Sequence, residues 1–225
     1  HGNIYANKNR QDITDYVAFR QAIKVQPTEP LYDPNDPTRY YLFSGHDYYN
    51  PVALLKTSIN RKEFLNLSGD LNIRWDLTDD LSTNLMIAEN ITEGSGYGYK
   101  TSNSHISRDN LYSGMASRDQ SRADNRILEW TGNYTLSRNA HNLQVLAGYS
   151  YQTFLNEDFS AWNANFPSDA LLWNSLGGGN WHSLSGGLVG PSSSKSTNTL
   201  IAFFGRANYS YAGKYLLTAS LRREG

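Results

Sequence analysis

Residues 200–225 read LIAFFGRANYSYAGKYLLTASLRREG, and this stretch has the pattern of a β-hairpin with one apolar face. Side chains alternate between the two faces of a strand. In both arms small, aliphatic and tyrosine side chains therefore share one face, while hydroxyl, amide and guanidinium groups share the other. Ala212-Gly213 forms a two-residue turn in which glycine supplies the positive φ. This polarity is typical of outer-membrane barrel strands, which present one face to lipid and the other to a polar lumen.

Two more segments, Phe64 to Thr92 and Leu128 to Thr153, repeat the design on either side of a short turn. Alternation with a period of two over such lengths indicates half-buried strands. Together with Leu200 to Arg223 they predict three antiparallel hairpins in one sheet. Glu89 breaks the apolar alternation, so there we expect the lipid-facing band to stop or the strand to bulge. The predicted strands are about 63–77, 81–92, 127–137, 141–154, 199–211 and 215–223.

The connections differ in length on the two sides of the predicted sheet. Short turns join the strands within each hairpin, whereas the polar stretches Glu93–Arg126 and Phe154–Asn198 join one hairpin to the next. Outer-membrane barrels show this asymmetry, with short periplasmic turns and long extracellular loops. The sequence thus predicts an all-β fold, an antiparallel transmembrane β-barrel segment of about six strands with long extracellular loops.

Residues 1–60 hold five of the seven prolines and little strand signal. Proline disfavours central strands, so this part is predicted to be an extracellular loop region. It includes a short amphipathic helix that ends before Pro27, because Tyr16, Phe19, Ala22 and Ile23 recur at helical spacing. The predicted division is therefore a loop region over 1–60 and a partial β-barrel over 61–225.

Tyrosine and tryptophan gather at both ends of the lipid-facing side. Trp75, Tyr134, Tyr211 and Tyr215 lie beside the short turns, and Trp130, Tyr149 and Tyr151 lie at the opposite strand ends. Tyr and Trp are good strand formers in any sheet, but an ordinary sheet does not sort them to both ends. Amphipathic rings favour the headgroup level of a membrane, so the pattern predicts two aromatic girdles.

Composition excludes several classes of function. The net charge of −1 removes the electrostatic basis for binding nucleic acid. The chain has no cysteine, and its five histidines are isolated, so neither a thiolate nor a histidine metal site is predicted. No Gly-x-Ser-x-Gly motif or phosphate-binding loop is present. We therefore expect no catalytic residues, no cofactor and no enzyme activity.

Several motifs resemble those of SusC/RagA-type TonB-linked outer-membrane proteins. The run Phe204-Gly205-Arg206, Asn208-Tyr209 and Lys214 to Gly225 is similar to that family's FGR-x-NY...KYLLTAS-x-RRDGSS signature, with Glu224 in place of the usual Asp. Agreement in order and spacing extends the resemblance over nearly the whole chain. The other matching stretches are Ala18 to Ile23 with Pro27 to Pro30, Tyr49 to Leu55, and Leu143 to Ser150.

The resemblance implies a fragment of a much larger channel in the outer membrane of a Gram-negative bacterium. A SusD-like surface lipoprotein would deliver oligosaccharide or peptide, and the TonB complex would supply energy through a coupling segment that, like the plug, we expect outside these residues. The implied function is nutrient import without bond-making chemistry. The alternative is a secreted β-rich glycan-binding lectin or adhesin, in which Leu65, Leu67, Leu71 and Ile73 pack against a second sheet. A barrel enzyme would need a convergent catalytic set, which we do not find.

Aromatic residues in the predicted extracellular loops are the candidates for binding a ligand or a partner. Loops on a rigid scaffold commonly carry recognition, and aromatic rings stack on sugars and on peptide side chains. The same rings also serve to pack loops against one another or against a partner protein. The sequence leaves both roles open for these candidates, which are Tyr48, Tyr49, Tyr97, Tyr99, Trp162, Trp173 and Trp181.

Overall fold

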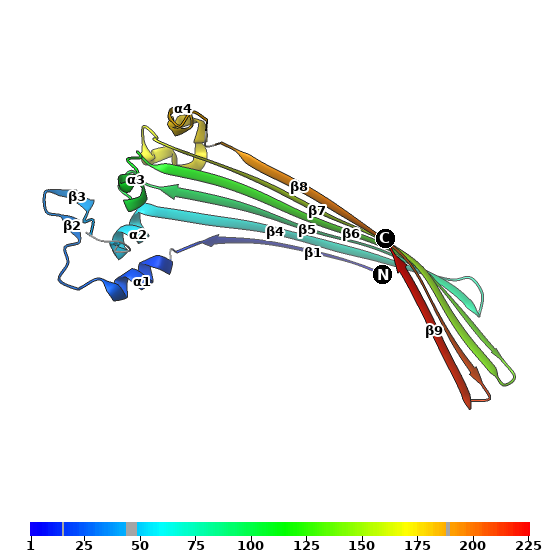
Figure 1. Cartoon of the computed structure of the whole chain (residues 1–225). Helices are drawn as coiled ribbons and strands as arrows, with labels where there is room; N and C mark the ends of the chain where they lie inside the picture. Colours follow the sequence, from blue (N-terminus) through cyan, green and yellow to red (C-terminus); the bar gives the residue numbers. More distant parts are fainter. Residues whose placement is uncertain (15, 44–48, 188–189) are drawn as a thin grey trace.

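One twisted antiparallel sheet dominates the computed structural model, which describes residues 1–14, 16–43, 49–187 and 190–225. Figure 1 shows its long strands side by side, with tight turns at one end and the helices gathered at the other. We call the first the turn end and the second, after the orientation predicted from the sequence, the extracellular end. In spatial order the strands are β1 (Gly2–Asp12), β4 (Ser58–Asp76), β5 (Leu81–Lys100), β6 (Met115–Arg138), β7 (His141–Ala164), β8 (Ser192–Tyr211) and β9 (Tyr215–Glu224).

The three predicted hairpins are β4–β5, β6–β7 and β8–β9, and they lie in one sheet as expected. Ala212 and Gly213 both have positive φ, of 52° and 68°, which is the conformation that a tight hairpin turn matching the strand twist requires. The predicted all-β, antiparallel fold is confirmed.

The strands reach much further toward the extracellular end than the sequence pattern indicated. The expected loops Glu93–Arg126 and Phe154–Asn198 begin and end as continuations of β5, β6, β7 and β8, and only residues 101–114 and 165–191 connect them. Backbone pairing continues there without a change of register, although most of the outward side chains are now charged, polar or aromatic. Alternating hydrophobicity therefore vanishes while the strands persist.

The first strand, β1, corrects the prediction that residues 1–60 are an extracellular loop region. It pairs antiparallel with β4 from Gly2 opposite Leu71 to Asp12 opposite Arg61. Its sequence, GNIYANKNRQD, carries only a short alternation, because Gly2, Ile4 and Ala6 lie opposite the outward residues of β4 while the positions from Lys8 onward are polar on both faces. The sheet thus has seven strands in the described part of the chain instead of about six.

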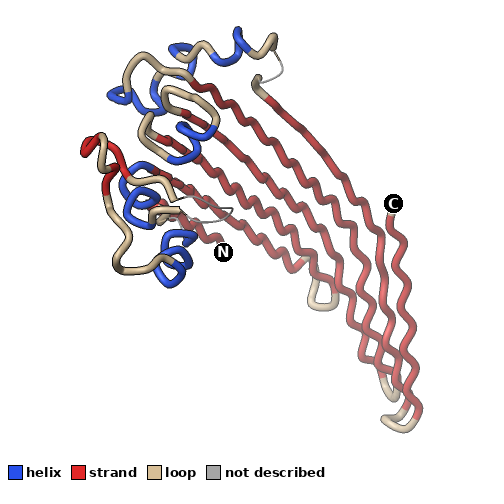
Figure 2. Tube along the Cα trace, turned by 60° about the vertical axis from the view of Figure 1, so that its left-hand side comes forward, coloured by secondary structure: helices blue, strands red, loops and turns tan. Residues whose placement is uncertain are grey.

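Short helices, loops and a two-stranded sheet lie at the extracellular end of the long strands (Figure 2). Helix α2 begins where Asn50 Oδ1 accepts hydrogen bonds from the backbone N–H groups of Val52 and Ala53, with Pro51 in the first turn. The predicted helix is present as α1. The elements are α1 (Tyr16–Lys24), β2 (Tyr32–Asp33), β3 (Asp36–Tyr40), α2 (Pro51–Thr57), α3 (His105–Asp109), η1 (Asp169–Asn174), η2 (Leu176–Gly178) and α4 (Trp181–Leu184). None of the helices in the described residues has the length and apolar character needed to cross a membrane.

The large sheet has no second sheet covering it in the described part of the chain. The leucines that a sandwich would bury remain accessible, with Leu67 and Leu71 at 41% and 45% exposure. The small two-stranded sheet of β2 and β3 lies among the short elements at the extracellular end. This arrangement argues against the alternative of a soluble sandwich.

Candidate functional site

The wall formed by β4 to β8 presents aligned rows of side chains on its outward face. Register places Leu71, Ile87, Leu128, Tyr151 and Ile201 in one row across the five strands. The rows between this one and the turns are also apolar or aromatic, as the alternation predicted. We call this part of the outward face the apolar band. About nine residues of β6 span it, which matches the roughly 25 Å apolar height of an outer-membrane barrel.

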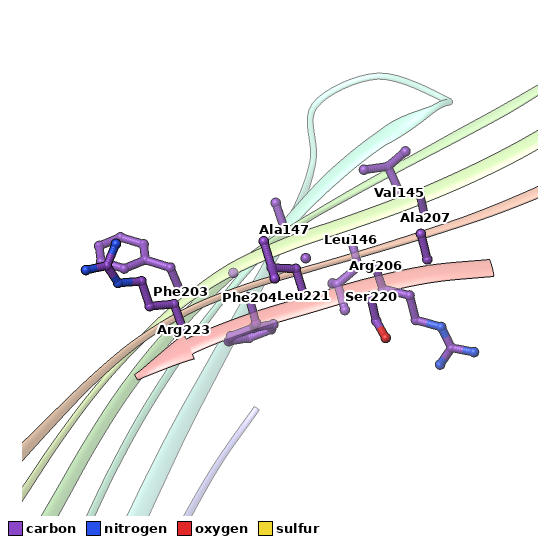
Figure 3. A pocket seen from close by; sticks show the side chains of 13 residues that line it. Val145, Leu146, Ala147, Phe203, Phe204, Arg206, Ala207, Ser220, Leu221 and Arg223 are labelled. Atoms are coloured by element: carbon purple, nitrogen blue, oxygen red, sulfur yellow. The ribbon is translucent and has the colours of Figure 1, made fainter. Parts of the chain in front are cut away.

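The apolar band is uneven. Over β4 and β5 it is made of leucine and isoleucine, whereas over β7 to β9 small residues leave a hollow of about 780 Å³. Figure 3 shows Phe203 and Arg223 together at one end of this hollow. Ala147, Gly205, Ala207 and Ala219 share the outward face at its floor. The apolar floor of the hollow is suited to contact with hydrocarbon chains.

A network of five charged side chains ends the apolar band on β5 and β6. We call it the charged belt: Glu89, Glu93, Arg122, Asp124 and Arg126. Arg126 lies 2.7 Å from Glu89 and 2.9 Å from Asp124, and Arg122 lies 3.3 Å from Asp124 and 3.5 Å from Glu93. Charges are costly on a lipid-facing surface, so the belt marks the upper limit of the band.

Glu89 decides between the two outcomes expected where the apolar alternation breaks. It stays in register, opposite Gly69 on one side and Arg126 on the other, so the strand does not bulge. The apolar band stops there on β5 and β6 instead.

The inward face is mainly polar, which is typical of a solvated lumen. Hydrogen bonds link neighbouring strands across it: Thr92 Oγ1 donates to Asn66 Oδ1 at 3.0 Å, and Thr218 Oγ1 donates to Asn208 Oδ1 at 3.0 Å. Aromatic rings lie among these polar groups in the described residues, at Phe64, Phe154, Trp162 and Phe204. Phe204 lies over Gly148, where a Cβ atom would come within 2.3 Å of the ring, and the Arg222 guanidinium lies 5.7 Å from the centre of the same ring.

At the extracellular end a small core holds two of the candidate aromatics, Tyr99 and Trp173, together with Ala116 and Phe166. The Tyr99 hydroxyl donates to Asp169 Oδ1 at 2.7 Å. Burial, followed by the hydrogen bond to Asp169 and its negative charge, raises the pKa of Tyr99 above its usual value. Tyr99 therefore stays protonated and serves as a fixed donor within the core.

Asp169 organises this end of the sheet, and the sequence alone did not single it out. Besides Tyr99, it accepts hydrogen bonds from the Ser102 backbone N–H at 3.1 Å and from Ser102 Oγ at 2.9 Å. It thereby ties η1 to the end of β5. The local signal was the cap: Ser168 Oγ accepts from the Ala170 N–H, so Ser168-Asp169 starts a helical turn.

Three more candidates contact neighbouring side chains of the same chain. Tyr97 lies between Arg118, whose guanidinium is 5.2 Å from the ring, and Trp173, whose ring is 5.6 Å away. The Tyr49 ring is 4.3 Å from the His105 ring, and the Trp181 ring is 4.7 Å from the Tyr112 ring. These contacts join the loops to the strands and to each other.

Trp162 stands apart from the other candidates. It lies on β7 opposite Ser117, two residues before the strand ends. Its position has the parity of the inward face, which it shares with Phe154 and Asp158. Tyr97 and Tyr99 have the outward parity, so the structure separates Trp162 from them. Tyr97, Tyr99 and Trp162 all lie on strands and not in loops, and Tyr48 lies outside the described residues.

The described residues provide no candidate metal site. They contain no group of three or more His, Asp or Glu side chains that could hold a metal ion. The buried Asp124 carboxylate pairs with two partly exposed arginines on the outward face. The arrangement is that of a wall with a polar inner face and a capped extracellular end.

Comparison with known proteins relates this wall to segments of larger barrels. No protein-family model matches the chain. The TonB-dependent receptor P3 of Formosa agariphila is 29% identical over 194 residues, which are 80% of this chain and 17% of the receptor. The RagAB peptide importer is similar in fold in two states. Its "open-open" state gives a TM-score of 0.67 at 18% identity over 86% of this chain and 21% of that one. The "closed-closed" state gives 0.65 at 20% identity over 83% and 20%.

The chain thus spans about a fifth of the length of the relatives it matches, between 17% and 21%. The predicted resemblance to a fragment of a SusC/RagA-type barrel is confirmed by these likenesses, and so is the all-β fold.

Proposed function

We propose that this chain is part of the wall of a TonB-dependent outer-membrane transporter. One observation carries the proposal: the strands that cross the apolar band run in one unbroken register, with aliphatic side chains outward and amides and hydroxyls inward. Only a membrane-spanning barrel needs both properties at once, because lipid demands an apolar exterior and complete backbone pairing. The similarity to a TonB-dependent receptor supports the same function.

The transported solute, in this proposal, is a peptide or an oligosaccharide that a SusD-like surface lipoprotein delivers, and the TonB complex supplies the energy. The fold shared with the RagAB peptide importer favours the peptide. The protein then acts by binding and passage and not as an enzyme. This places it in the outer membrane of a Gram-negative bacterium, where it serves nutrient uptake.

Trp162 is the candidate aromatic best placed to meet a solute. It has the inward parity near the extracellular end, and none of the ring contacts that hold Tyr97, Tyr99 and Trp173 is recorded for it. A ring that stacks on a peptide or sugar contributes on the order of 1–2 kcal/mol, or roughly tenfold in affinity. Trp173 and Trp181 hold the loops together in this proposal and act on lid-protein association only indirectly.

The test compares two aromatics of the same strand that lie on opposite faces. In the full-length transporter, Trp162→Ala should raise the half-saturating solute concentration for uptake by whole cells roughly tenfold. Phe159→Ala, on the outward face and 46% exposed, should leave uptake unchanged. Surface abundance of both variants is measured in parallel. Equal uptake by both variants at normal abundance would remove Trp162 from the solute path, and uptake that persists without TonB would contradict the transporter itself.

A further inference from the structure

Helix α1 is amphipathic, but its large apolar side chains are exposed and are not covered by the described part of the chain. Tyr16, Phe19 and Ile23 are 80%, 75% and 73% exposed. The buried positions of the helix are Ala18 and Gln21, at 3% and 0%. A surface helix ordinarily buries its apolar stripe, so the exposed face of Tyr16, Phe19 and Ile23 needs a partner. We call it the α1 face.

Membrane lipid does not cover the α1 face, because the helix lies too far above the apolar band. It follows β1, whose last residue, Asp12, pairs with Arg61. Leu71 in the upper row of the band is ten residues further along β4 than Arg61. Ten strand residues cover about 33 Å along the strand, or about 25 Å of height at the tilt of a barrel strand. The α1 face is therefore in the extracellular space.

The position of α1 indicates what covers it. Figures 1 and 2 both place α1 at the extracellular end of β1, which is the last strand on that side of the sheet. Helix α2 lies next to α1, at the start of β4. The helix contacts α2 through the side that holds Ala18 and Gln21, since these are its buried residues. At 100° per residue, Tyr16, Phe19 and Ile23 lie on nearly the opposite side, so the α1 face points away from the sheet beyond β1.

The same side of the molecule carries a free strand edge. All eleven residues of β1 are exposed, and β4 is its one neighbour in the described chain. A row of unpaired backbone groups is a template for another strand, and closed barrels leave no such edge. The free edge and the α1 face are therefore two parts of one uncovered surface, with hydrogen-bonding groups below and apolar side chains above.

We infer that the α1 face is covered by the extracellular continuation of the barrel strand that pairs with the free edge of β1, a segment of the same protein outside these 225 residues. The inference rests on the proposed barrel function. Relatives about four to five times the length of this chain have ample sequence for such a segment. The continuation carries aliphatic or aromatic side chains toward Phe19, because the face offers three apolar side chains and no charged partner is needed to satisfy them.

Thiol labelling in the full-length protein distinguishes this segment from other occupants. The 225 residues contain no cysteine, so Phe19→Cys introduces a single thiol among them, and the unsubstituted protein gives the background. Lys24→Cys is the matched control, because Lys24 is exposed on the same helix but lies about 100° away from the α1 face. A bulky maleimide reagent is applied to intact cells with and without the surface lipoprotein, and to the purified monomer.

The expected result is that Phe19→Cys reacts at least tenfold more slowly than Lys24→Cys in all three preparations. Equal labelling of the two variants would overturn the inference and leave the α1 face free. Protection that requires the lipoprotein would assign the face to the lid, and protection lost in the monomer would assign it to a second copy; both results overturn the inference. Solute uptake is measured in the same strains, so that normal uptake with a freely labelled Phe19→Cys refutes only this inference and not the transporter function.

Discussion

The two halves of the long strands differ in their outward side chains and in little else. On β6 the lower half carries Leu128, Trp130 and Leu136 outward, and the upper half carries Arg118, Arg122 and Arg126 at the same parity. Register runs through both halves without a shift, and the inward face is mainly polar in both. The change from apolar to charged side chains is therefore confined to the outward face of the sheet, while the strand backbone continues past it.

The outward face of the lower half should resist charge far more than that of the upper half. Ile73→Arg places a guanidinium in the apolar band and should destabilise the full-length barrel by about 2–4 kcal/mol, whereas the inward Asn72→Arg should cost much less. Ser95→Arg has the same outward parity in the upper half and should change stability by less than about 0.5 kcal/mol. Reversible unfolding in lipid vesicles measures all three. Similar losses in the free energy of unfolding for Ile73→Arg and Ser95→Arg would contradict a lipid boundary between the two halves.

Glycines on the inward face should also differ between the halves. Gly148→Val forces the added side chain into the Phe204 ring, at 2.3 Å, and should cost about 1–3 kcal/mol. Gly96→Val in the upper half meets only the Asp119 carboxylate, which can swing away into the lumen, so its cost should be below about 1 kcal/mol. Unfolding in lipid gives both values, and adding Phe204→Ala should relieve part of the Gly148→Val cost. A larger loss of stability for Gly96→Val than for Gly148→Val would show that the inward face is packed more tightly in the upper half than in the lower half.

The charged belt at the junction gives a smaller effect. The Asp124 side chain is 3% exposed and neutralises Arg122 and Arg126, which are 38% and 61% exposed. Asp124→Asn keeps the shape but leaves both arginines without this partner, and because they are partly solvated the cost should be about 1–2 kcal/mol. Arg74→Ala, which removes an exposed pair with Asp76, should stay within about 0.5 kcal/mol. Unfolding at low and high salt measures both; a cost for Asp124→Asn no greater than that for Arg74→Ala would contradict a structural role for the belt.

The sequence predicted the strands correctly in the lower half of the sheet but not in the upper half. In the lower half, alternation located all three hairpins and assigned outward and inward faces to residues such as Leu71 and Asn72. In the upper half and in most of β1 the apolar side chains no longer keep to alternate positions, so the same criterion predicted loops where β1 and β5 to β8 form strands. Of the candidate site, the sequence singled out the aromatic residues but not Asp169, whose hydrogen bond to Tyr99 joins positions 70 residues apart.

The sequence by itself determined the alternation of the hairpins, their turns, the apolar band and the resemblance to a family, because each is a local property of consecutive residues. Only the tertiary structure decided that Gly2–Asp12 is a strand, that Tyr99 and Trp173 share a core while Trp162 has the inward parity, and that α1 exposes Phe19. The physical reason is that strand pairing satisfies backbone N–H and C=O groups whatever the side chains are. Contacts between distant segments likewise depend on where the chain returns in space, which no local period records.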